Sequence, residues 1–197
     1  EKEAFRIEYW ELEEAKLRRM PPEKELVGKV ALITGAAGGI GSATAKKFLS
    51  EGCCVILTDI DKKSLNTKQN ELSELYGKDM VHSILMDVTN EQDVKRAVSK
   101  SINSFGGIDI LVANAGFASA ALFEKTSSKL WDKNMDILSK GCFLISREVY
   151  QKMIEQKNGG SIIFVSSKNS LNASKGASAY SVAKSSLLHL SRSIALE

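Results

Sequence analysis

The sequence predicts an α/β fold, in which a doubly wound parallel sheet is covered by helices on both faces. Short runs rich in Val, Ile and Leu alternate along the chain with longer segments of helical periodicity. The short runs are apolar throughout instead of alternating between apolar and polar residues, which is typical of strands buried on both faces. Strands that alternate with helices in this way indicate βαβ units, whose strands are parallel.

Each predicted element follows from these patterns. The expected strands are Lys29–Thr34, Cys53–Asp59, Met80–Val88, Ile108–Ala113 and Ser161–Ser166. The expected helices are Gly39–Glu51, Lys62–Tyr76, Glu91–Phe105, a long stretch from about Thr126 to Lys157, and a last one from Ser178 onward. The last helical pattern reaches Glu197 without a stop signal, so we expect a piece of a longer polypeptide whose sheet is C-terminally incomplete.

Length and composition exclude several classes of protein. The 197 residues suit one domain, and 43% hydrophobic with 26% charged residues indicates a soluble globular protein. A net charge of only +3 gives no argument for nucleic acid, and no apolar run approaches the roughly 20 residues that span a membrane. Cys53 and Cys54 are adjacent and Cys142 is distant, which argues against a disulfide framework and favours a reducing, cytoplasmic location. His82 and His189 are isolated, so we expect no metal site.

The first 27 residues differ in composition from the rest of the chain. Residues 1–27 are dense in Glu, Lys and Arg with interspersed aromatic and apolar residues, and they include Pro21-Pro22. We expect a short strand or helix that leads into a linker. Two interpretations stay open: an N-terminal extension that packs on its own domain, and an interdomain connector. Residues 28–197 carry the alternating pattern and form the predicted domain.

A glycine-rich turn joins the first expected strand to the first expected helix. It reads Thr34-Gly-Ala-Ala-Gly-Gly-Ile-Gly41. A glycine directly after the strand permits a tight exit, a later one lets backbone N–H groups approach a pyrophosphate, and the last allows close helix–strand packing. The N-terminus of the helix adds partial positive charge and free N–H donors. We therefore expect a dinucleotide site formed by Gly35, Gly38, Gly39, Ile40 and Gly41.

Acidic residues end the second and third expected strands. Asp59 lies 18 positions after Gly41, close to the spacing of about 20 expected for the acidic residue that binds the adenosine ribose hydroxyls. A carboxylate there repels a 2′-phosphate, and no arginine follows Asp59 or Gly41, which favours NAD over NADP. Asp87 and Val88 end the third strand, where the Asp87 carboxylate can accept a hydrogen bond from the adenine amino group.

Three residues near the last helix suggest hydride-transfer chemistry. Tyr180 and Lys184 are four residues apart at the start of the expected helix, which puts both side chains on one face. A neighbouring ammonium stabilises the phenolate form of a tyrosine, which makes it a better base near neutral pH. Ser167 lies 13 residues before Tyr180, at the end of the fifth expected strand, where its hydroxyl can orient a substrate oxygen.

Taken together and in this order, these motifs resemble the short-chain dehydrogenase/reductase family. The resemblance covers residues 28–197 and rests on the glycine turn, Asp59, Asp87, Asn114-Ala115-Gly116, Ser167 and Tyr180-Ser-Val-Ala-Lys184. It implies a Rossmann fold with strand order 3-2-1-4-5-6-7, binding of NAD, and hydride transfer to or from a small-molecule substrate. It also implies a proton-transferring Tyr180, a substrate-orienting Ser167 and a ribose-binding Lys184. Asn114, Ala115 and Gly116 would pack beside the cofactor and stabilise the central sheet.

The sequence departs from that family at one position of the long helix. The family usually has an asparagine in a stretch such as the one from Trp131 to Gly141, and Leu138 stands in its place. In the family that asparagine holds a helix kink and a water of the proton relay. Lys168 and Asn169, just after the serine, either compensate or contact an anionic substrate, or else both face solvent.

A closer resemblance rests on Phe5–Glu13, Lys16–Leu26, Phe164–Ser170 and Leu138. These segments resemble the dehydrogenase half of bifunctional rhamnulose-1-phosphate aldolase/short-chain dehydrogenases, which are often labelled sorbitol-6-phosphate dehydrogenase. That resemblance implies carbohydrate metabolism of the rhamnose-catabolic kind, a lactaldehyde-type or sorbitol-6-phosphate-type substrate, and an aldolase domain upstream. The family also implies a homo-dimer or homo-tetramer.

The leading hypothesis is thus an NAD-dependent dehydrogenase acting on a small alcohol, hydroxyaldehyde or sugar phosphate. The rival is a nucleotide-binding regulator or scaffold that has lost turnover.

Overall fold

The structure is a computed structural model, and it describes residues 2–19 and 24–197. Its centre is a five-stranded sheet in the order β3-β2-β1-β4-β5. The strands are β1 (Val30–Thr34), β2 (Cys54–Asp59), β3 (Val81–Leu85), β4 (Ile110–Ala113) and β5 (Ser161–Phe164), and every neighbouring pair is parallel. The predicted α/β fold is therefore confirmed, with the first five strands in the expected order.

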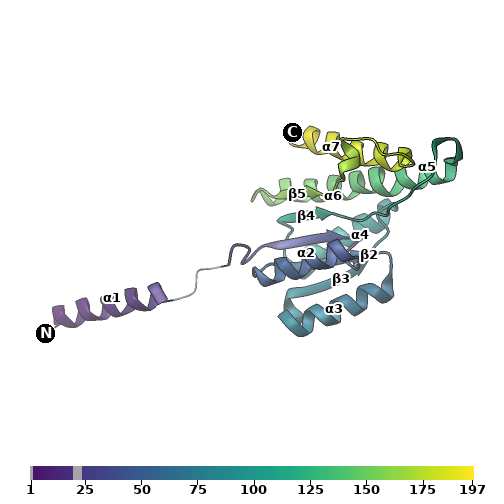
Figure 1. Ribbon diagram of the computed structural model, residues 1–197. Coiled ribbons are helices and arrows are strands. Elements are labelled where there is room, and N and C mark those ends of the chain that lie inside the picture. Colours follow the sequence, from purple (N-terminus) through teal and green to yellow (C-terminus); the bar gives the residue numbers. More distant parts are fainter. Residues whose placement is uncertain (1, 20–23) are drawn as a thin grey trace.

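Helices cover both faces of the sheet (Figure 1). The α-helices are α1 (Lys2–Arg19), α2 (Gly39–Ser50), α3 (Lys62–Tyr76), α4 (Glu91–Phe105), α5 (Ser128–Asn134), α6 (Gly141–Gln156) and α7 (Ser178–Ile194). Shorter helical segments are η1 (Lys78–Met80), η2 (Phe123–Lys125), η3 (Met135–Lys140) and η4 (Lys168–Ser170). Helices α2 and α3 share one buried apolar cluster with the sheet, whereas α4, α6 and α7 share the other.

The central strand β1 shows why the sheet needs two covering layers. All five of its residues are buried, and successive side chains point to opposite faces. Leu32 joins the cluster of α4, α6 and α7, while Ala31 and Ile33 join the cluster of α2 and α3. An apolar run without alternation is thus the signature of a strand between two helical layers.

The predicted long helix is a continuous helical stretch with an irregular centre. Helices α5 and α6 are joined without a break by η3, a π-helical segment in which the Gly141 N–H donates to the Asp136 carbonyl. Such segments often mark functional sites because they change which carbonyls are bonded within the helix. This one lies immediately around Leu138, which is fully buried.

Residues 2–19 form a helix where the sequence left strand or helix open, and α1 stands apart from the sheet (Figure 1). Its aromatic and apolar side chains Ile7, Tyr9, Trp10 and Leu12 are exposed. The predicted linker at Pro21-Pro22 lies outside the described residues. The division of the chain at residue 27 stays a prediction.

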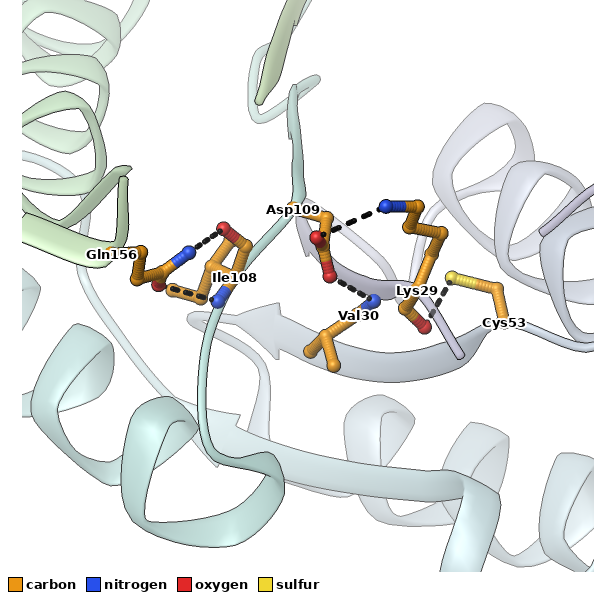
Figure 2. Close-up of polar contacts among 6 residues, drawn as sticks. All are labelled: Lys29, Val30, Cys53, Ile108, Asp109 and Gln156. Atoms are coloured by element: carbon orange, nitrogen blue, oxygen red, sulfur yellow. Dashed lines mark hydrogen bonds and ion pairs between the residues drawn. The ribbon is translucent and has the colours of Figure 1, made fainter. Parts of the chain in front are cut away.

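The edge of the sheet opposite the strand carboxyl ends is fixed by side chains (Figure 2). The Asp109 carboxylate accepts a hydrogen bond from the Val30 N–H at 2.9 Å and lies 3.5 Å from the Lys29 ammonium. The Gln156 amide accepts from the Ile108 N–H at 2.9 Å and donates to the Ile108 carbonyl at 3.0 Å. Because its N–H and carbonyl both bond to the Gln156 side chain, Ile108 does not pair with the neighbouring strands. Strand β4 therefore begins after it, at Ile110, and not at the predicted Ile108.

We predict that Gln156→Ala lowers the free energy of unfolding by about 1–3 kcal/mol, because it leaves two buried backbone groups of Ile108 without a partner. Urea unfolding followed by circular dichroism measures the change. Gln151→Ala, at an exposed position of the same helix, is the matched control and should change stability by less than about 0.5 kcal/mol. Equal effects of the two substitutions would contradict this account of the β4 boundary.

Candidate active site

A cavity of about 620 Å³ opens at the carboxyl ends of the strands. This volume lies within the range of small-molecule and cofactor sites. Most of the predicted site residues line it, namely Gly35, Gly38, Gly39, Ile40, Asp59, Asp87, Val88, Asn114, Ala115, Gly116, Tyr180 and Lys184. Gly41 and Ser167 do not. Sequence reasoning missed Thr58, Ile60, Met86, Phe117, Ala118, Lys133, Ile137, Val165 and Ser166, which also line it.

The glycine turn is packed so closely that two of its glycines cannot carry a side chain. Gly35 has a φ of +64°, and a Cβ there would lie 2.9 Å from the Ala115 Cα. A Cβ at Gly41 would lie 2.9 Å from the Ala36 Cα. Gly41 therefore holds the first turn of α2 against the end of β1, which explains why it is needed although it does not line the cavity.

The N-terminus of α2 presents free donors to the cavity. Its N-cap residue Gly38 makes no side-chain hydrogen bond, whereas Asp61 caps α3 and Asn90 caps α4 through their side chains. A Cβ at Gly39 would meet no atom within 4 Å. An uncapped helix N-terminus beside open space is a site for an anion such as a pyrophosphate. The residues present thus fit a dinucleotide.

The carboxylate of Asp59 is held in place by two backbone N–H groups. Its oxygens accept hydrogen bonds from the Ala37 N–H and the Asp61 N–H, each at 3.0 Å. These bonds connect the end of β2 to the glycine turn. They leave further lone pairs on the carboxylate, which can accept from ribose hydroxyls.

Asp87 is oriented by the loop that follows β3. One of its oxygens accepts from both the N–H and the hydroxyl of Thr89, at 2.8 and 2.7 Å. The other oxygen is available to a ligand in the cavity. Val88 packs against α6 at Gly141, where a Cβ would lie 2.8 Å from the Val88 Cγ2.

Asn114 connects the end of β4 to the glycine turn. Its side-chain amide donates to the Thr34 carbonyl at 2.9 Å and to the Gly35 carbonyl at 3.1 Å. The Thr34 hydroxyl in turn accepts from the N–H groups of Asn114 and Ala115, both at 2.9 Å. This network fixes the floor of the cavity between β1 and β4.

Lys184 is buried beneath the cavity wall, with only 5% of its surface exposed. Its ammonium donates to the Val165 carbonyl at 2.7 Å, and burial lowers its pKa from the ordinary value. Its own backbone carbonyl accepts from the Ser166 hydroxyl at 3.3 Å. Tyr180, one turn earlier on α7, lines the same cavity. The structure thus brings the predicted phenol and ammonium together at the carboxyl edge of the sheet.

Ser167 lies just outside the cavity lining. Its hydroxyl oxygen accepts from the Asn169 N–H at 3.2 Å at the start of η4, and its neighbour Ser166 lines the cavity instead. Lys168 is exposed, and the Asn169 side chain accepts from the Ser174 hydroxyl at 3.0 Å. Neither Lys168 nor Asn169 lines the cavity, so the structure does not place them where they would compensate for Leu138.

Within the described residues no group of three or more His, Cys, Asp or Glu side chains is arranged to hold a metal ion. In the same part of the chain no helix is both long and apolar enough to cross a membrane.

Comparison with known proteins adds the family. The profile of the short chain dehydrogenase family matches residues 29–197. This chain belongs to that family. It is 47% identical over 197 residues to the uncharacterized oxidoreductase YuxG of Bacillus subtilis (strain 168), which is 100% of this chain and 29% of that protein. It is 38% identical over 172 residues to the 3-oxoacyl-(acyl-carrier-protein) reductase FabG of Thermotoga maritima, covering 87% of this chain and 69% of that protein.

Solved structures of short-chain dehydrogenases share the fold. The structure of NAD⁺-bound xylitol dehydrogenase has a TM-score of 0.84 and 32% sequence identity, covering 88% of this chain and 66% of that chain. The chain therefore spans less than a third of the YuxG protein and about two-thirds of these other relatives.

Leu138 stands where the family usually has an asparagine, and the helix of this short-chain dehydrogenase is still irregular at that position. The π-helical segment η3 surrounds Leu138, whose side chain packs on Gly116, where a Cβ would lie 2.8 Å from the Leu138 Cδ2. A buried asparagine, Asn134, lies one turn earlier, and it donates to the Leu130 carbonyl at 2.7 Å and accepts from the Ser119 hydroxyl at 3.0 Å. An asparagine side chain at 138 is thus not required for the irregularity.

We predict that Gly41→Ala and Gly39→Ala separate stability from ligand binding. Gly41→Ala should lower the free energy of unfolding by about 1–3 kcal/mol, because its methyl group meets backbone atoms that cannot move aside. Gly39→Ala should leave stability within about 0.5 kcal/mol of the parent but weaken dinucleotide binding, because its methyl group projects where the pyrophosphate approaches. Thermal unfolding and NADH titration measure the two effects; a stability loss at Gly39 equal to that at Gly41 would contradict the geometry.

Proposed function

We propose that the chain is the nucleotide-binding and catalytic core of an NAD(H)-dependent short-chain dehydrogenase. Its substrate is a small alcohol, hydroxyaldehyde, polyol or sugar phosphate. The observation that carries the proposal is the meeting of Tyr180 and Lys184 with the uncapped N-terminus of α2 in one cavity. When bound, the nicotinamide ring donates or accepts the hydride.

The residues of the chain then handle the proton and the substrate. The Tyr180 hydroxyl donates its proton to the substrate oxygen in reduction and accepts it back in oxidation. The Lys184 ammonium lies on the same face of α7 and stabilises the phenolate that remains. Ser167 lies just outside the cavity lining, next to Ser166. Because its hydroxyl oxygen accepts from the Asn169 N–H, its own O–H stays available to donate to a substrate oxygen that reaches beyond the lining.

The rival hypothesis of a regulator without turnover rested on Leu138. The η3 irregularity persists around Leu138, and Tyr180 and Lys184 keep their places in the cavity. The geometry thus favours turnover over a purely regulatory role.

Two features of the cavity support NAD over NADP. Asp59 presents a carboxylate, held by the Ala37 and Asp61 N–H groups, where a 2′-phosphate would have to sit. The residue that follows it, Ile60, is apolar and lines the cavity, so no arginine stands there to neutralise a phosphate.

We predict that the full-length protein binds NADH at least about tenfold more tightly than NADPH. Asp59→Ser should raise the Kd for NADH by about 10- to 100-fold, because a charge-assisted hydrogen bond to the ribose contributes about 1.5–3 kcal/mol. Titration of NADH and NADPH by fluorescence measures both values. Asp79→Ser, an exposed carboxylate away from the cavity, is the matched control. Tighter binding of NADPH would refute the assignment of Asp59.

We predict that Tyr180→Phe removes at least about 99% of turnover, because proton transfer by a positioned side chain contributes about 10²–10⁴-fold to the rate. The Kd for NADH should change by less than about threefold, since the ring and the fold are kept. Steady-state assays against lactaldehyde and a panel of polyols and their phosphates, with NADH titration as the control, measure the effect. Retained turnover in Tyr180→Phe would refute the catalytic assignment.

The partners of the chain are also part of the proposal. We expect a homo-dimer or homo-tetramer formed through the α5–α6 stretch and α7, whose outer faces expose Phe143, Ile154 and Val182.

We further propose that residues 1–27 connect to an upstream aldolase domain. The exposed apolar side chains of α1 support this, as does the alignment of the whole chain with less than a third of the YuxG protein. A cytoplasmic location belongs to the same proposal.

A further inference from the structure

The charges on the wall of the cavity are unevenly distributed. Four charged residues line it, with the two carboxylates on one side and the two ammonium groups on the other. The carboxylates of Asp59 and Asp87 follow β2 and β3 on one side of β1. The ammonium groups come from Lys133 on α5 and Lys184 on α7, which belong to the other side. The Asp59–Asp87 end matches the adenosine part of a dinucleotide, whereas nothing in that function explains Lys133.

The two ammonium groups are in different surroundings. Lys184 is buried, and its charge is directed to the Val165 carbonyl. Lys133 is exposed, and its ammonium lies over the ring of Phe117, 4.8 Å from the ring centroid. Throughout residues 2–19 and 24–197, no carboxylate lies within ion-pair distance of the Lys133 ammonium, and this includes the adjacent Asp132 and Asp136 three residues later.

Phe117 gives this ammonium a defined position without neutralising it. An aromatic face attracts a cation through its quadrupole but carries no net charge. Phe117 itself follows Asn114-Ala115-Gly116 and lines the cavity, so the contact holds the Lys133 side chain along the cavity wall. The full positive charge and three N–H donors remain available to a ligand.

We propose that Lys133 is a phosphate-binding residue of this cavity. An ammonium binds a phosphate as a point charge through short, charge-assisted hydrogen bonds, and Lys133 lines this cavity. The phosphate comes either from a phosphorylated substrate or from the pyrophosphate of the dinucleotide. This inference rests on the proposed function and extends it, because a substrate phosphate at Lys133 would make phosphorylated hydroxy or carbonyl compounds the preferred substrate class.

The test compares Lys133→Met with the unsubstituted full-length protein. Methionine is an unbranched side chain one heavy atom shorter than lysine; it can still contact the Phe117 ring through its sulfur, but it removes the charge. Lys129→Met is the matched control, because Lys129 is exposed on the same helix and does not line the cavity. The Kd of NADH is measured by fluorescence titration. The Kd of inorganic phosphate is measured by calorimetry, both on the protein alone and on the protein saturated with NADH.

If the phosphate belongs to the substrate, Lys133→Met weakens inorganic phosphate binding to the NADH-saturated protein by about tenfold or more and leaves the Kd of NADH within about twofold. If it belongs to the dinucleotide, Lys133→Met raises the Kd of NADH by about tenfold, and saturating NADH prevents phosphate from binding. Both results support the proposal and distinguish the two sources.

The proposal is overturned if Lys133→Met and Lys129→Met have the same Kd values for NADH and for phosphate. It is also overturned if the unsubstituted protein binds no phosphate and its Kd for NADH does not depend on Lys133. A protein that binds no NADH would refute the proposed function instead. In that case the phosphate titration of the protein alone still decides the role of Lys133.

Discussion

The close contact between the glycine turn and the ends of β1 and β4 is the constraint on which the site depends. The amide of Asn114 donates to the carbonyls of Thr34 and Gly35, and the left-handed Gly35 lies against the backbone of Ala115. Gly41 holds the first turn of α2 in this contact. Because α2 is thereby fixed above the strand ends, its uncapped N-terminus lies on the wall of the cavity. A single extra methyl group at Gly35 or Gly41 would separate these layers.

Around this fixed floor Tyr180 and Lys184 line the cavity, while one residue that the family usually has is replaced by Leu138. The π-helical η3 segment persists with Leu138 at its centre, because the local hydrogen-bond pattern is a property of the backbone and its packing on Gly116. Lys184 remains buried and bonded to the Val165 carbonyl beside it. The helix irregularity and the orientation of the lysine are therefore set by the packing of α5, α6 and α7 together.

The cavity has an acidic side and a basic side, and this division follows from the topology of the sheet. Consecutive parallel strands β1, β2 and β3 bring Asp59 and Asp87 to one side of the sheet, while the crossover from β3 to β4 takes the chain to the other. Lys133 and Lys184 are on helices that follow β4 and β5, so they gather on that second side. The carboxylates and the ammonium groups of the cavity wall therefore lie on opposite sides of β1.

The sequence by itself determined the layered α/β fold, most element boundaries and many of the residues that line the cavity, because uniformly apolar strands and a glycine turn are local signals. It did not determine that Gln156 would delay the start of β4, nor that Ser166 rather than Ser167 would line the cavity. It also missed Lys133, although its spacing of four residues from Ile137 puts both on one face of the helix. Which face points into the cavity depends on how α5 packs against α7 and the sheet. Only the tertiary structure decides that, because it is a contact between segments distant in the sequence.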